Sequence, residues 1–221
     1  MSYLIRVSLP DVPGSLGQLA EAFGMVDADI KSVDIVEAAI DGTVTDDIVV
    51  ELPTGVMVDT LITAVASVDG AEVDSIRPFT GRVDRRGQIQ LLARIAAHSG
   101  NLNNALGELV GVIPGAVTSS WAVVLRNGPD GLSRVAASQA APEDDGSTPA
   151  QIDIAKACVL DPETDEWAPR SWFQLDTALT ITPLHGTDLM LTVGRVGGPD
   201  FLASEVREIG DLGAIIGAML S

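Results

Sequence analysis

The sequence contains little cysteine and few aromatic residues. Cys158 is the one cysteine among 221 residues, so no intrachain disulfide can form. This predicts a reducing, cytoplasmic location. Phe, Trp and Tyr make up only 4% of the chain, although 46% of it is hydrophobic. The hydrophobic core must therefore be built mainly from Val, Ile, Leu and Ala.

Basic residues are also scarce, with 13 Lys and Arg against 31 Asp and Glu, which gives a net charge of −18. A surface this negative repels phosphate backbones and anionic lipid surfaces, so we expect neither a nucleic acid nor a membrane as partner. No apolar run approaches the roughly 20 residues that span a bilayer. The N-terminus lacks the basic segment and apolar core of a signal peptide.

The residues that commonly carry catalysis or bind metals are isolated. His98 and His185 have no Cys, His or paired carboxylates at ligand spacing. Cys158 falls in a predicted helix over 150–160, where a lone cysteine usually serves as a small core residue. The acidic stretches 143–145 and 161–166 lack EF-hand spacing and are expected to be solvated loops. We therefore expect no metal, no cofactor and no enzymatic activity.

What the sequence does contain is a clear pattern over residues 3–30. Apolar and polar residues alternate up to Leu9, which predicts a strand. The segment PDVPGS interrupts this pattern, and a helical spacing follows that is carried by Leu16, Leu19, Ala20 and Phe23. Gly24 is expected to end the helix, and a second strand begins near Ala28. Free N–H groups at Gly14, Ser15 and Leu16 would make the start of this helix attractive to carboxylates.

The pattern continues to residue 79 with four further elements. These are a strand from residue 30, a paired strand over 43–52 after the turn Asp41-Gly42, a helix over 58–65 and a strand over 72–79. The resulting order β-α-β-β-α-β is that of a ferredoxin-like domain.

Residues 3–80 resemble the ACT domain family. The resemblance rests on this element order and on the signature D-x-P-G-x-L, present as Asp11-Val12-Pro13-Gly14-Ser15-Leu16. It implies a regulatory module that binds an amino acid between two ACT domains. The ligand-binding residues it implies lie in the first loop and at the start of the second strand: Asp11, Val12, Pro13, Gly14, Ser15, Leu16, Asp29 and Ile30.

The chain departs from the best-known amino-acid-binding members of this family. It has Leu9 where they carry a histidine, and aspartates at positions 11 and 29 where they carry Asn-type residues. Asparagine can accept from an ammonium and donate to a carboxylate, whereas an aspartate only accepts. Two aspartates would therefore favour a cationic group. An equally weighted alternative is that Asp11 caps the turn and Asp29 is a solvated strand end.

A polar segment follows the first domain and is expected to be a linker over 81–88. It carries Arg82, Arg85 and Arg86, which are either solvated or form a bridge to acidic residues of the first domain or a partner chain. Beyond it, we expect helical segments over 89–112 with a break at Gly100. The remaining predicted elements are strands over 117–126, 132–138, 178–184 and 189–196, a short helix over 150–160 and a closing helix over 201–220.

Residues 90–221 resemble the GAF domain family. The matching pieces are Thr182-Pro183-Leu184-His185-Gly186 and Pro199-Asp200-Phe201. GAF domains bind small molecules between their sheet and a variable segment, or dimerise. Here the variable segment contains Trp167, Trp172 and Phe173, which either cover a pocket or close the core, and we expect the latter.

Together these patterns predict an α+β protein with an ACT-like domain over 1–80, a linker over 81–88 and a GAF-like domain with an antiparallel sheet and flanking helices over 89–221. The expected function is that of a non-catalytic, allosteric sensor, a homodimer that binds a small molecule, most plausibly an amino acid. The alternative is a dimerisation or interaction module that docks onto a partner enzyme or transporter without a ligand.

Overall fold

The computed structural model describes residues 1–79, 85–147 and 149–221. The chain forms two compact units, Met1–Asp84 and Arg85–Ser221. The arginine cluster expected in the linker lies outside the described part, since Arg82 and the side chains of Arg85 and Arg86 are not described.

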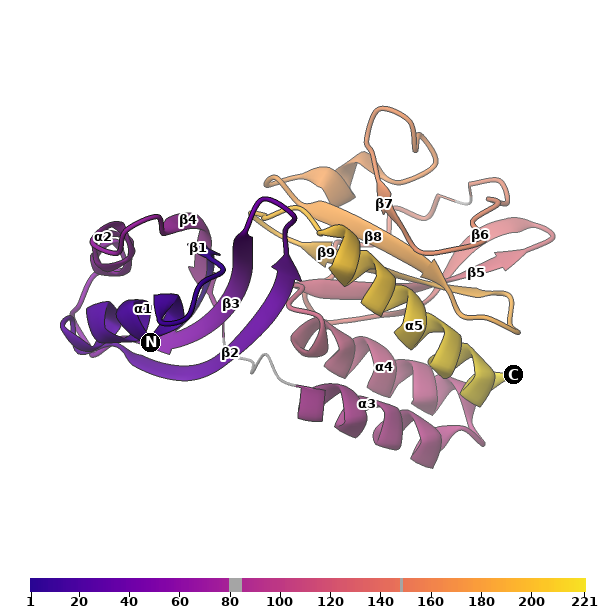
Figure 1. Ribbon diagram of the computed structural model, residues 1–221. Helices are drawn as coiled ribbons and strands as arrows, with labels where there is room; N and C mark the ends of the chain where they lie inside the picture. The colour runs from indigo at the N-terminus through magenta and orange to yellow at the C-terminus, as the bar shows by residue number, and fades with distance from the viewer. Residues whose placement is uncertain (80–84, 148) are drawn as a thin grey trace. The chain divides into compact units, whose positions relative to one another are not determined.

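The N-terminal unit has the predicted order β-α-β-β-α-β (Figure 1). Its elements are β1 (Ser2–Pro10), α1 (Ser15–Gly24), β2 (Asp29–Ala38), β3 (Thr43–Glu51), α2 (Asp59–Ala66) and β4 (Glu72–Pro78). The four strands form one antiparallel sheet in the order β2-β3-β1-β4, so β2 and β4 are its edges. The prediction of a ferredoxin-like element order is confirmed.

The core of this unit lies between the sheet and its two helices. Alternate residues of β1 (Ile5, Val7 and Leu9) are fully buried and pack in one cluster with residues of both helices, among them Phe23 and Leu61. This alternation is the period of two that identified β1 from sequence.

The C-terminal unit is a five-stranded antiparallel sheet in the order β6-β5-β9-β8-β7. In Figure 1 the helices α3, α4 and α5 lie together on one face of this sheet. The elements are α3 (Arg85–His98), α4 (Leu102–Ala116), β5 (Trp121–Gly128), β6 (Gly131–Ala137), β7 (Cys158–Leu160), a short 3-10 helix η1 (Arg170–Phe173), β8 (Ala178–Pro183), β9 (Leu189–Arg195) and α5 (Ala203–Leu220). The α+β class with two antiparallel sheets is thus confirmed.

Two predicted boundaries in this unit were wrong. Helix α3 begins at Arg85, so residues 85–88 are helical and not part of a linker. Residues 150–160 do not form a helix: they end in β7, which pairs with β8. The reason is a period of two, because Ile152, Ile154 and Cys158 all pack on the same hydrophobic cluster.

Cys158 is consequently a strand residue that is partly buried. Burial raises the pKa of its thiol, and the neighbouring Asp165 raises it further. Since the thiolate is the reactive form, this environment disfavours a nucleophilic role.

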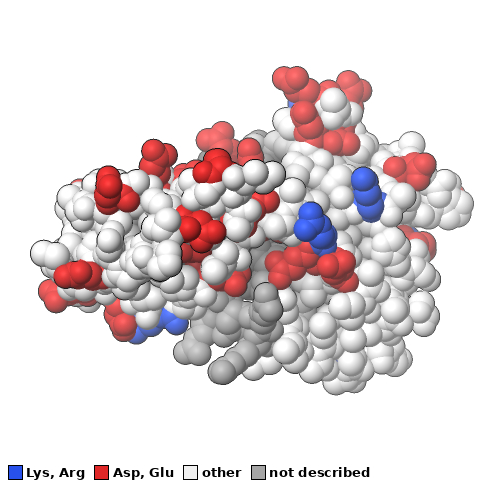
Figure 2. All heavy atoms as spheres, in the orientation of Figure 1, with Lys and Arg blue, Asp and Glu red and all other residues white. Residues whose placement is uncertain are grey.

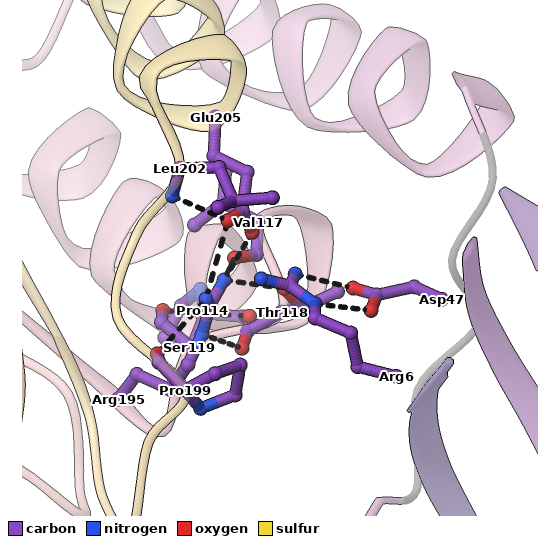
Figure 3. Close-up of polar contacts among 10 residues, drawn as sticks. All are labelled: Arg6, Asp47, Pro114, Val117, Thr118, Ser119, Arg195, Pro199, Leu202 and Glu205. Atoms are coloured by element: carbon purple, nitrogen blue, oxygen red, sulfur yellow. Dashed lines mark hydrogen bonds and ion pairs between the residues drawn. The ribbon is translucent and has the colours of Figure 1, made fainter. Parts of the chain in front are cut away.

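A buried ion pair fixes the beginning of α5 (Figure 3). The guanidinium of Arg195 is fully buried and donates from Nη2 to Glu205 Oε1 (2.6 Å) and to Thr118 Oγ1 (2.8 Å). It also lies 4.0 Å from the ring centroid of Phe201. Glu205 Oε2 in turn accepts from the Leu202 N–H at the helix N-cap (2.9 Å). A charge this deeply buried is tolerated because its donors are satisfied.

Within the described ranges, no helix is long and apolar enough to cross a membrane.

Candidate functional site

The loop between β1 and α1 is held in a shape that its sequence dictates. Gly14, at the N-cap of α1, has φ = 102°, a left-handed conformation that glycine adopts without strain. The Asp11 N–H donates to the Gly42 carbonyl oxygen (2.8 Å). This bond ties the loop to the turn between β2 and β3. The whole segment Asp11–Gly14 is exposed, so a ligand can reach it.

The helix start offers fewer free donors than the sequence suggested. The Ser15 N–H is not free, because it donates to the Val12 carbonyl oxygen (3.3 Å). The first helical bond runs from the Gln18 N–H to the Gly14 carbonyl (3.0 Å), and Gly14 has no side chain that could cap the helix. The N–H of Leu16 therefore lies in the first turn, before this bond, and points out of the helix N-terminus. This end of α1 can still attract a carboxylate.

Asp29 and Ile30, the other predicted ligand-binding residues, lie at the start of β2. Asp29 is exposed but ion-paired, since Lys31 Nζ lies 2.5 Å from its Oδ2 and 2.8 Å from Glu51 Oε2. Hydrogen bonds to these two carboxylates raise the pKa of Lys31, and Lys31 lowers the pKa of Glu51. Ile30 is partly buried against the core of the unit.

The two groups of predicted ligand-binding residues are far apart in one chain. Asp11 follows Pro10, which pairs with Thr43, whereas Asp29 pairs with Glu51, eight residues further along β3. At about 3.4 Å per strand residue this places them about 27 Å apart. A single copy of the chain therefore cannot hold one small ligand between Asp11 and Asp29.

A residue that the sequence analysis did not single out lies near the Asp11 loop. Asp46, in β3 between Val7 and Ile35, is only 2% exposed, and its Oδ1 has no hydrogen-bond partner in the described part of the chain. Burial raises its pKa, and the charges of Asp34, Asp47 and Asp11 raise it further. The signal in the sequence was the pair Asp46-Asp47 inside an otherwise apolar strand.

Asp47 differs from Asp46 because its charge is neutralised. Arg6 donates from Nε to Asp47 Oδ1 (2.7 Å) and from Nη2 to Oδ2 (2.8 Å), a bidentate pair between neighbouring strands (Figure 3). Both side chains are 2% exposed. The excess negative charge at this end of the sheet therefore rests on Asp46 and Asp11. Figure 2 shows many acidic and few basic side chains over the visible face of this unit.

This charge does not amount to a metal centre. Across the residues that the structure describes, no group of three or more His, Cys, Asp or Glu side chains is arranged to hold a metal ion. The arrangement is better suited to an ammonium group, which needs one or two carboxylate acceptors and no fixed coordination geometry.

Comparisons with known proteins give no family. No protein-family model and no curated protein matches the chain. Two solved structures are partly similar. One is an unknown protein from Galdieria sulphuraria, with 18% identity over 45% of this chain and a TM-score of 0.31. The other is a formyltetrahydrofolate deformylase from Pseudomonas putida, with 10% identity over 42% of this chain and a TM-score of 0.31. The chain spans 64% and 37% of their respective lengths, and similarities this low carry no functional argument.

Proposed function

We propose that this protein is a non-catalytic sensor that binds an amino acid at the β1–α1 loop of its N-terminal unit. The observation that carries the proposal is Asp46, a buried carboxyl without a hydrogen-bond partner among the described residues, close enough to Asp11 for the two charges to interact. An ammonium group satisfies both carboxyls. The N–H groups at the start of α1 accept the α-carboxylate of the same molecule.

The distribution of charge makes the ammonium the group that decides specificity. Asp11 and Asp46 both carry carboxyls, so a ligand with two carboxylates and no amine is repelled. A helix N-terminus contributes about 0.3–1 kcal/mol to binding an exposed anion, which is too little to overcome this repulsion. An amino acid presents both charges at the required positions.

The proposal includes a homodimer, because one chain cannot bring Asp29 to the loop. Strand β2 is an edge of the sheet, and it and its turn expose three apolar residues: Val33 (36%), Ile35 (65%) and Ile40 (107%). Antiparallel pairing of β2 with β2 of a second copy, about a two-fold axis, would bring Asp29 of one copy to the end of the sheet where Asp11 of the second copy lies. The implied contribution of Asp29 and Ile30 then comes from the second copy.

The exposed edge also favours a second candidate function. An apolar edge strand is a ready template for pairing with another chain. The protein would then be an interaction module that dimerises or docks onto a partner enzyme or transporter, with no ligand. Ligand binding distinguishes the two functions.

The experiment is a set of thermal melts of the full chain, followed by far-UV circular dichroism, against each of the common amino acids. A ligand at 100 times its dissociation constant adds about 2.7 kcal/mol to the stability of the native state. For any amino acid that raises the melting temperature, the matching 2-hydroxy acid is tested next. It keeps the carboxylate and lacks the amine, so the proposal expects it to give no shift. A flat panel favours the interaction module.

A further inference from the structure

The C-terminal unit contains a cavity that lies apart from the site proposed above. Leu125 of β5 and Leu132 of β6 are buried and form part of its lining. Trp167 and Trp172, from the irregular segment before β8, line it as well. The cavity encloses about 360 Å³ of space, part of it open to solvent.

The two tryptophans are held firmly. Trp167 and Trp172 meet edge to face, with ring centroids 6.4 Å apart and planes at 87°. Trp172 also packs edge to face against Trp121, at 5.7 Å and 68°. The expectation that these aromatic residues close the core is therefore only part of their role: Trp172 is 3% exposed and belongs to the core cluster, and it lines the cavity together with Trp167.

The rim of the cavity is acidic. Glu143, Asp144 and Asp145 are exposed residues of its lining, and Arg134 is the one basic residue there. Arg134 is already engaged, since its Nη1 donates to the Pro142 carbonyl (2.7 Å) and its Nε lies 4.0 Å from Asp144 Oδ2. The charges of Arg134 and Asp144 balance, which leaves those of Glu143 and Asp145.

The loop that carries these acids is itself ordered by hydrogen bonds. Asp145 Oδ1 accepts from the Ser147 N–H (2.9 Å), and Asp144 Oδ1 accepts from the Gly146 N–H (3.0 Å). The hydrogen bonds from Ser147 lower the pKa of Asp145. The carboxylates therefore keep fixed positions beside the tryptophans.

We infer that this cavity binds an organic cation with an apolar body, such as a quaternary or protonated amine. Tryptophan is the side chain whose ring attracts cations most strongly, and the uncompensated carboxylates attract the same charge from the rim. The leucines provide contact area for the apolar part of the ligand. Anionic ligands, including phosphates and carboxylates, are excluded by the same rim.

The test uses benzyltrimethylammonium, which combines a permanent positive charge with an apolar ring, and the full-length protein. The chain has only three tryptophans, so the indole N–H signals in ¹H–¹⁵N spectra identify the cavity once each is assigned through its Trp→Phe variant. The expected result is a saturable shift of the Trp167 and Trp172 signals, with an affinity at least tenfold higher than for neutral benzyl alcohol. Benzenesulfonate should not bind.

Variants on the exposed loop separate charge recognition from folding. The double variant Glu143→Gln/Asp145→Asn should weaken binding of benzyltrimethylammonium at least threefold. Its control is Glu163→Gln/Asp211→Asn, which removes two exposed carboxylates that do not line the cavity and should leave the affinity unchanged. Absence of a saturable shift, equal binding of benzyl alcohol, or equal affinities in the two double variants would overturn the inference.

Discussion

Asp11 and Asp29 lie at opposite ends of the same sheet. Asp11 follows the end of β1 next to the turn at Gly42, and Asp29 pairs with Glu51 at the far end of β3. The resemblance to the ACT family assigns both residues to one ligand. Within a single copy the register forbids this, so the two assignments are compatible only in an assembly of two chains.

The first prediction concerns this assembly. Ile35→Lys places a charge on the exposed apolar edge β2 and should convert a dimer into a monomer in sedimentation velocity. Ile62→Lys, on the exposed face of α2, is the matched control and should leave the dimer intact. A wild-type chain that sediments as a monomer at all concentrations would contradict the two-copy site.

The second prediction concerns the loop. Gly14→Val should abolish the response to an amino acid, because a β-branched residue is strained at φ = 102° and shifts the helix start. We expect a loss of stability of about 1–3 kcal/mol, measured by urea denaturation and far-UV circular dichroism, without loss of the fold. Asp29→Ala, a surface change, should abolish the response with little effect on stability.

Gly17→Ala is the control for the loop variants. It lies in the first turn of α1, and a Cβ there would meet nothing within 4 Å. Alanine favours the helix over glycine by about 1 kcal/mol, so this variant should be slightly more stable and should retain the response. A full response in both Gly14→Val and Asp29→Ala would remove the proposed site.

Sequence reasoning was most successful where a single periodicity decides the structure. The alternation in β1 and the helical spacing after Gly14 define the N-terminal unit, and the structure reproduces that element order. It failed at residues 150–160, where a short apolar run fits a helix as well as a strand. There the pairing of β7 with β8, a contact between distant residues, decides the outcome.

Asp46 shows why the site itself was harder to predict than the fold. Its sequence neighbour Asp47 has the same chemistry, but the two side chains point to opposite faces of β3. One meets Arg6, and the other is buried near Asp11 with an unpartnered oxygen. Which aspartate is neutralised depends on the register between β1 and β3, and composition and spacing do not contain that information.

The third prediction is a pH dependence caused by Asp46. Its pKa is raised in the folded state from the ordinary value of 3.8, so the folded chain holds this proton more tightly than the unfolded chain. Asp46 therefore lowers the free energy of unfolding as the pH rises above 3.8. Asp46→Asn should be more stable than the wild type at pH 7, and the difference should vanish below pH 3.8. Urea denaturation at a series of pH values measures this, and a less stable Asn variant at pH 7 would show that the carboxylate is satisfied.

The fourth prediction concerns the pair Arg6–Asp47. Removing one partner of a buried ion pair leaves an uncompensated charge, so Arg6→Met should cost about 3–5 kcal/mol. The double variant Arg6→Met/Asp47→Leu should recover part of this loss. Because Trp121, Trp167 and Trp172 all lie in the C-terminal unit, tryptophan fluorescence reports that unit alone. Circular dichroism is therefore needed to follow the N-terminal unit.

The most direct test of the account is isothermal titration calorimetry of the amino acid that gives the largest thermal shift, into the wild type and into Asp46→Asn. Asp46→Ser is run beside them, to separate loss of the charge from loss of the side chain. The account predicts saturable binding to the wild type at one molecule per chain. It also predicts at least tenfold weaker binding to both variants at pH 7. Equal affinities in all three proteins would contradict the claim that Asp46 receives the ammonium group, and the absence of binding by any amino acid would contradict the sensor function itself.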